Sequence, residues 1–204
     1  VGWWAGNIGY RRPQIQVRKG FPVADDSRFE FRGALTRTIG DNNLFGPGDT
    51  GEDSGFPTLQ GRLAYEFPLL TDSKTILGIS GHWGEEEYDI TNTGSNRNFD
   101  TWSLNADLTI PLLEKLVLKG EYFYGENLDA YLGGIAQGIH FIDFDGNPAN
   151  GNEYPQEGVL SHGGWAAFSI GPFGDFIYNV GASIDDPDND DLNVNARSQN
   201  TSIF

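Results

Sequence analysis

The chain has 204 residues, no cysteine, no methionine and a formal net charge of −16. The lack of cysteine excludes a disulfide scaffold and a thiolate metal site, and the acidic balance argues against nucleic-acid binding. No apolar run reaches the ~18 residues of a membrane helix, and no basic-then-apolar signal peptide opens the chain. We expect both termini to be cut, as in an internal segment of a longer protein; a complete mature domain with processed ends is the alternative.

Apolar and polar residues alternate with a period of two along much of the chain. Within 28–37, Phe29 and Phe31 alternate with Glu30 and Arg32, and the pattern returns at later segments. Strands with one apolar and one polar face have this period. We therefore predict eight strands, with another beginning after Arg197. The eight predicted strands are 13–21, 27–38, 58–67, 75–89, 100–111, 115–125, 162–171 and 175–185.

The connections between these strands alternate between short and long. The short ones carry Pro, Gly, Asp or Ser and are 22–26, 68–74, 112–114 and 172–174. The long ones are rich in Asn, Asp and Gly and are 39–57, 90–99, 126–161 and 186–197. Short turns on one side and long loops on the other are typical of a transmembrane β-barrel. We predict an all-β, antiparallel barrel segment of eight to nine strands, with 1–204 as a single domain.

Aromatic residues are expected at both ends of the strands, around an aliphatic middle. Near the short turns lie Phe21, Phe29, Tyr65, Phe67, Phe173 and Phe176. Near the long loops lie Trp83, Trp102, Tyr122, Tyr124 and Trp165. Two aromatic girdles match the two interfaces of a bilayer, although aromatic residues also fill soluble cores.

The polar face is expected to line a lumen, because a charge at the bilayer midplane costs ~2–4 kcal/mol. Its candidate pore-lining residues are Arg18, Arg28, Glu30, Arg32, Arg62, Glu66, His82, Glu86, Asp107, Lys119 and Glu121. Across the turn at 112–114 we expect Asp107 opposite Lys119, and Asn105 opposite Glu121. On the other face we expect Trp102 opposite Tyr124.

Basic residues gather near the first strands. Arg11 and Arg12 precede strand one, and Arg18, Arg28, Arg32 and Arg62 follow on one face. A row of arginines on a pore wall attracts anions, because guanidinium groups bind carboxylates and phosphates. The alternative is a mixed-sign network in which they pair with Glu30, Glu66 and Glu86.

The connection 126–161 is long enough to be functional. Asn127 is expected to cap a short helix that continues to Ile135, before glycines end it. If this loop folds inward it narrows the pore, and otherwise it stays outside.

The acidic run 185–191 suggests a calcium site at Asp186, Asp188 and Asp190, although the glycine and glutamate of an EF-hand are missing. A solvated turn is the alternative. For catalysis, Ser80 and His82 share a face, but the chain lacks a G-x-S-x-G elbow and an H-E-x-x-H motif. We therefore expect no enzyme activity and no cofactor other than possible structural calcium.

Several short segments resemble long bacterial porins of the DcaP-like and planctomycete-type families. They are 6–17 (GNIGYRRPQIQV), 125–135 (GENLDAYLGGI), 163–165 (GGW) and 185–187 (DDP). The resemblance implies a trimeric outer-membrane diffusion pore of about sixteen strands in the full protein. It also implies a basic pore wall at Arg11, Arg12 and Arg18.

The sequence therefore favours a porin of the bacterial outer membrane that passes small hydrophilic solutes, with anions among the candidates. Its expected partners are outer-membrane lipid and two further copies in a homotrimer, with no nucleic acid. Two other classes stay open. One is a small, closed, eight-stranded barrel that acts as an anchor or adhesin. The other is a soluble, secreted β-sandwich that binds glycans.

Overall fold

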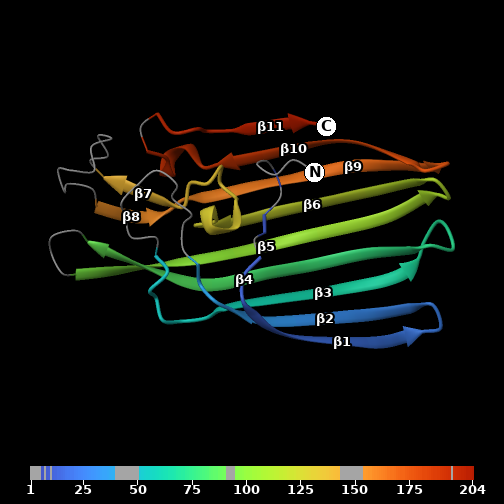
Figure 1. Ribbon diagram of the computed structural model, residues 1–204, viewed down its shortest axis with the longest axis horizontal. Coiled ribbons are helices and arrows are strands. Elements are labelled where there is room, and N and C mark those ends of the chain that lie inside the picture. The colour runs from blue at the N-terminus through green and yellow to red at the C-terminus, as the bar shows by residue number, and fades with distance from the viewer. Residues whose placement is uncertain are drawn as a thin grey trace.

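The computed structural model describes residues 6, 8–9, 11–39, 51–90, 95–142, 154–193 and 195–204. Nine strands form one antiparallel sheet in the order β1-β2-β3-β4-β5-β6-β9-β10-β11, so each strand lies beside its predecessor in this series (Figure 1). Their bounds are β1 Gln14–Ala24, β2 Ser27–Thr36, β3 Thr58–Pro68, β4 Lys74–Ile90, β5 Ser95–Leu113, β6 Leu116–Glu126, β9 Leu160–Phe173, β10 Phe176–Pro187 and β11 Asn200–Ile203.

The predicted all-β antiparallel class is confirmed, and every predicted strand is present. The described sheet is open, with β1 at one edge and β11 at the other. A closed barrel is therefore not part of the observed fold. Figure 1 shows the short turns gathered at one end of the strands and the long connections at the other. No helix of the described residues is long and apolar enough to cross a membrane.

The connection 126–161 contains structure that the sequence pattern did not predict. A single 3-10 turn, η1 Asp129–Tyr131, is followed by a small hairpin of β7 Ile139–Ile142 and β8 Tyr154–Gly158. A second 3-10 turn, η2 Asn189–Asp191, follows β10. The predicted cap was wrong. Leu128 precedes η1 without a side-chain cap bond, and Asn127 is itself in the left-handed region with φ 53°.

The sheet has two chemically different faces, as the period-two pattern predicts. Its apolar face leaves large hydrophobic side chains exposed on every strand of the main sheet. These include Ile15, Val17, Phe31, Leu63, Ile79, Leu104, Tyr122, Phe168, Tyr178, Val180 and Ile203. The other face carries charged and amide side chains. No second layer covers the apolar face in the part of the chain that the structure describes.

Aromatic side chains cluster toward both ends of the apolar face. At the short-turn end Tyr65 lies between Phe29 and Phe67, with ring centroids 4.7 and 4.8 Å away. At the long-loop end the rings of Trp102 and Tyr124 are 5.7 Å apart. Trp165 departs from the prediction.

Trp165 is opposite Glu121 on β6 and belongs to the polar face, where its indole N–H donates to that carboxylate. The strand register places it there, because alternate residues of a strand point to opposite faces.

The predicted register of the β5–β6 hairpin was wrong by two residues. Asp107 is opposite Glu121, whereas Lys119 is opposite Thr109. A two-residue turn at 114–115 and a register shift between Pro111 and Leu113 cause the difference. Proline has no N–H for the ladder, which favours an irregularity beside it. An even-numbered shift keeps every side chain on its predicted face, so Lys119 remains on the polar side.

The same shift separates the other two predicted pairs. Asn105 is opposite Phe123, and Trp102 is opposite Glu126, to which its indole N–H donates at 3.1 Å. Trp102 and Tyr124 therefore meet as diagonal neighbours and not as directly opposed residues.

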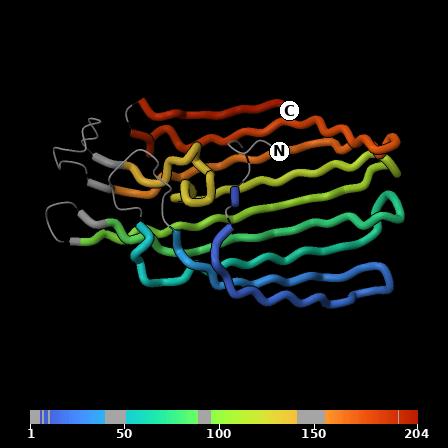
Figure 2. Tube along the Cα trace, in the orientation of Figure 1, coloured from blue at the N-terminus to red at the C-terminus, as the bar shows by residue number. Residues whose placement is uncertain are grey.

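Two segments lie over the polar face. Residues 127–138 fold back onto the sheet (Figure 2), and Gly6 and Gly9 contact Gly164 of β9 and Tyr131 of this loop. The Gly9 N–H donates to the Tyr131 carbonyl at 2.8 Å, which joins the two segments. Gly6 has φ +72°, and a Cβ there would overlap the carbonyl oxygen of Gly164 in β9. Only glycine permits this close approach without strain.

Candidate functional site

Three arginines form a row across the first strands of the polar face. Arg18 is opposite Arg32, and Arg32 is opposite Arg62. Like charges directly opposite one another destabilise a sheet unless they are neutralised. The neighbouring row, one step toward the short turns, supplies carboxylates at Glu30 and Asp107.

The Glu30 carboxylate is shared by two arginines. It accepts from Arg18 Nε at 2.7 Å and from Arg32 Nε at 2.6 Å, and it forms ion pairs with both. Its side chain is only 4% exposed, whereas Arg18 and Arg32 are 56% and 39% exposed. This triad therefore carries one more positive than negative charge, and that excess faces solvent.

The other two arginines that were predicted to line the pore each have a carboxylate of their own. Arg62 donates to Asp107 through two nitrogens, at 2.9 and 2.6 Å. Arg28 donates to Glu66 in the same two-pronged way, at 2.9 and 3.0 Å. Of the two sequence hypotheses, the contacts agree with the mixed-sign network and not with a bare row of arginines. Glu86 is the exception, because the four ion pairs of these arginines do not include it.

Glu86 belongs to a second network near the long loops. Its carboxylate accepts from the Asn127 amide at 2.7 Å, and both residues are buried. The Thr101 hydroxyl donates to the Asn127 carbonyl at 2.7 Å. The same hydroxyl lies 3.1 Å from His82 Nε2, and His82 Nδ1 lies 2.7 Å from Ser103 Oγ. This network ties residue 127 to β4 and β5.

Ser80 is not the partner of His82. Its hydroxyl instead accepts from the Asn105 amide at 3.5 Å. The two ring nitrogens of His82 are held by the hydroxyl groups of Ser103 and Thr101, and neither of these partners is a carboxylate. The predicted pore-lining residues Lys119 and Glu121 lie farther along the polar face, on β6.

Tyr131 closes the network from above the sheet. The Tyr131 ring stacks on the His82 ring, with the two centroids 3.9 Å apart. The Arg12 guanidinium lies over the Tyr131 ring, 4.1 Å from its centroid. Arg12 also donates to the Ala130 carbonyl at 3.3 Å. Burial raises the pKa of Tyr131, which keeps the phenol neutral, and burial lowers the pKa of Arg12. Arg12 thus leaves the predicted basic row and holds the inward loop.

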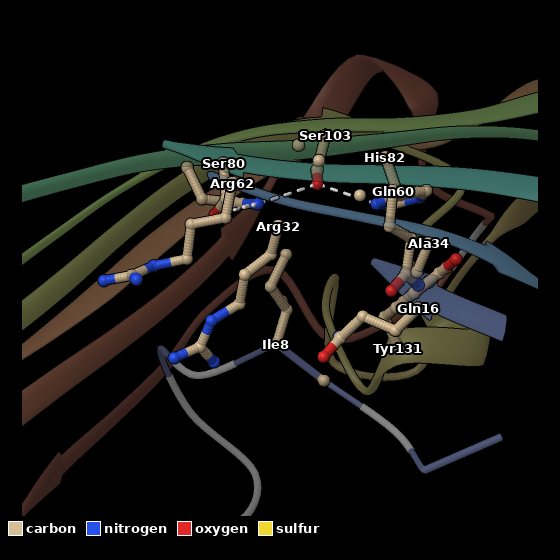
Figure 3. Close-up of a pocket in the computed structure, with 15 residues that line it drawn as sticks. Ile8, Gln16, Arg32, Ala34, Gln60, Arg62, Ser80, His82, Ser103 and Tyr131 are labelled. Carbon is tan, nitrogen blue, oxygen red and sulfur yellow. Dashed lines mark hydrogen bonds between the residues drawn. The ribbon is translucent and has the colours of Figure 1, made fainter. Parts of the chain in front are cut away.

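A cavity of about 270 Å³ lies between this loop and the strands. Figure 3 shows side chains from β1, β2, β3, β4 and β5 around it, with Tyr131 entering from the loop. Its polar lining includes Gln16, Arg32, Gln60, Asn105 and Tyr131. Sequence reasoning missed Gln60, Asn127 and Tyr131 as site residues. The apolar run inside a polar loop at 128–135 was the available signal that this loop packs against something.

The acidic run does not form a metal site. Asp188 accepts from the backbone N–H of Asp190 at 3.0 Å, and Asp186 accepts from the Gln199 amide at 3.0 Å. In the described part of the chain, no three acidic or histidine side chains lie close enough to hold a metal ion. The proposed calcium ligands Asp186, Asp188 and Asp190 therefore do not converge. The Asp188 side chain instead caps the N-terminus of η2.

Comparisons of the chain with family models, with curated proteins and with solved structures found no match.

Proposed function

We propose that this sheet is part of the wall of a transmembrane β-barrel in a bacterial outer membrane, and that the barrel passes small hydrophilic solutes by diffusion. The observation that carries the proposal is the opposition of the two faces. One face exposes large apolar side chains along the whole sheet, and the other holds ionised groups in pairs. A lipid phase outside and water inside satisfy both faces.

Strand length supports the same proposal. β1, β2, β3 and β6 have 11, 10, 11 and 11 residues. A tilted strand needs ~9–11 residues to cross the hydrocarbon core. β4 and β5 are longer, with 17 and 19 residues, and their extra length lies on the side of the long loops. Aromatic groups at Tyr65 and Trp102 fit the two interfaces.

The open edges need partners in a membrane, because unpaired backbone groups in hydrocarbon cost several kcal/mol each. In this proposal further strands pair with β1 and β11 and complete the barrel. We also propose that the protein forms a homotrimer, and cross-linking would measure this oligomeric state. Residues 127–138 cover part of the polar face, which favours a narrowed pore. The same observation also fits the second candidate, a membrane anchor whose barrel interior is plugged.

Planar-bilayer conductance of the full-length protein separates these two candidates. We expect stepwise current, because the paired charges of the polar face need water beside them. Joint replacement of Arg18, Arg28, Arg32 and Arg62 by glutamine should shift the reversal potential toward cation selectivity. Lys119→Gln, on the same face, is the single-charge control. Silence from protein that is folded and inserted would favour the plugged anchor.

A further inference from the structure

The cavity under the inward loop contains polar atoms that the protein itself leaves unsatisfied. Tyr131 is only 4% exposed, and its hydroxyl lies beside the Gln60 and Thr58 side chains without a well-formed hydrogen bond to either. The Asn105 side-chain oxygen is likewise buried without a partner. Both residues line the same cavity of about 270 Å³. Buried polar groups are normally paired, so two groups with spare hydrogen-bonding capacity in one cavity favour the binding of a polar molecule there.

The charged groups of the cavity do not require an anionic ligand. Its two cations, Arg32 and Arg62, already donate to Glu30 and Asp107. An anion would also meet the Asn105 oxygen, which can only accept a hydrogen bond. The uncommitted groups need a partner that both donates and accepts.

Neutral donors and acceptors dominate the rest of the lining. Gln16 and Gln60 each bring an amide with both functions, and Tyr131 brings a hydroxyl with both. Figure 3 shows Arg32 and Tyr131 on the same side of the sheet, with Gln16 and Gln60 beside them. The volume is slightly below the ~300–1,000 Å³ of typical small-molecule sites, which suits a ligand smaller than a drug molecule.

We infer that this cavity binds a small neutral polyhydroxylated solute, of the size of a monosaccharide or linear hexitol. Each hydroxyl of such a solute both donates and accepts, so it satisfies Asn105 and Tyr131 together. This inference rests on the proposed function for its meaning, because a solute bound here is held on the wall of a pore only if the polar face lines one. It deepens that function by naming a solute class and a stopping point on the wall.

Titration calorimetry of the full chain in detergent micelles tests the site, with sorbitol, D-glucose and sodium succinate as ligands. We expect saturable heat from sorbitol and D-glucose, and at least tenfold weaker binding of succinate. Tyr131→Phe should weaken sorbitol binding roughly three- to tenfold, as loss of one hydrogen bond does. The same variant should keep or raise the urea midpoint of unfolding, because it removes an unpaired hydroxyl.

Asn179→Ala is the matched control, since Asn179 lies exposed on the polar face of β10, outside the cavity. It should leave sorbitol binding unchanged. Tighter binding of succinate than of sorbitol, unchanged affinity in Tyr131→Phe, or no saturable heat from either polyol would overturn the inference. Conductance of the same preparation separates the two proposals. Current without sorbitol binding would contradict only the proposed binding site. Sorbitol binding without current would contradict the proposed pore and leave the proposed site standing.

Discussion

Two buried carboxylates on the polar face are held in different ways. Glu30 is 3% exposed and is neutralised by two arginines whose own side chains reach solvent. Glu86 is 1% exposed, and the Asn127 amide donates to it from the inward loop. The first arrangement sets up charge beside water, and the second fixes a loop. A buried carboxylate on this face can thus either set up charge beside solvent or fix the position of a loop.

The largest expected effect comes from Asn127→Asp, which replaces the amide donor by a second carboxylate against Glu86. We expect a loss of about 3–5 kcal/mol in the free energy of unfolding, the cost of an uncompensated buried charge. Urea unfolding in detergent, followed by tryptophan fluorescence, measures it. The loss should shrink when the pH is lowered, because protonation of one carboxyl relieves the repulsion.

Asn127→Gly is the control for that variant, since glycine tolerates the left-handed backbone at this position and only removes the amide. Its loss should be smaller, about 1.5–3 kcal/mol, as for one hydrogen bond to a charged group. Equal stability of Asn127→Asp and the unchanged protein would show that Glu86 does not anchor the loop.

Glu30→Gln tests the other half of the comparison. It leaves Arg18 and Arg32 directly opposed without a shared anion, and we expect a loss of about 1 kcal/mol because both arginines are partly exposed. The loss should fall as salt is raised from 0.05 to about 1 M, where the Debye length drops to ~3 Å. A salt-independent loss would mean that packing, and not charge, is what Glu30 supplies.

Arg12→Gln should have an effect of similar or smaller size, since it removes one contact with the Tyr131 ring. We expect a loss of about 0.5–1 kcal/mol, together with faster proteolysis within 127–138. Arg12→Lys keeps the charge and should recover only part of the loss, because lysine lacks the planar group that stacks on a ring. Full recovery by lysine would show that charge alone holds the loop.

Lys119→Gln should have the smallest effect on stability, within about 0.5 kcal/mol, because the side chain is exposed. Its effect should be confined to ion selectivity, where it removes one positive charge from the polar face. Urea unfolding and bilayer reversal potentials give the two values. A loss of stability comparable to that of Glu30→Gln would contradict the distinction between exposed charged residues such as Lys119 and buried, paired ones such as Glu30.

Alternation made the strands predictable from the sequence, since residues such as Phe29, Glu30 and Phe31 can satisfy an amphipathic strand and little else. Faces followed from the same parity, and so the charged residues that were predicted to line the pore lie on the polar side. Register did not follow, because it depends on turn length and on the irregularity after Pro111. Trp165 was misplaced for a related reason, since its face is set by pairing with Glu121.

The candidate site was only half predictable. The ion pairs join residues of one strand or of strands that lie close together in the chain. Arg28 of β2 and Glu66 of β3, two strands that follow one another, are an example. The contact between Tyr131 and His82 depends on how a long loop returns to the sheet, and no local pattern encodes that path. The buried Asn127 was read as a helix cap because the same side chain chemistry serves both roles.

The central claim is that lipid covers one face of this sheet and water the other. Because the chain has no cysteine, single cysteines can report on each face in intact membranes. Neighbouring residues point to opposite faces, so Ile79→Cys is paired with Ser80→Cys, and Leu104→Cys with Asn105→Cys. We predict that a charged, water-soluble maleimide labels Ser80→Cys and Asn105→Cys and spares the other two. Equal or faster labelling of Ile79→Cys and Leu104→Cys, which are 58% and 62% exposed when wild type, would contradict the account.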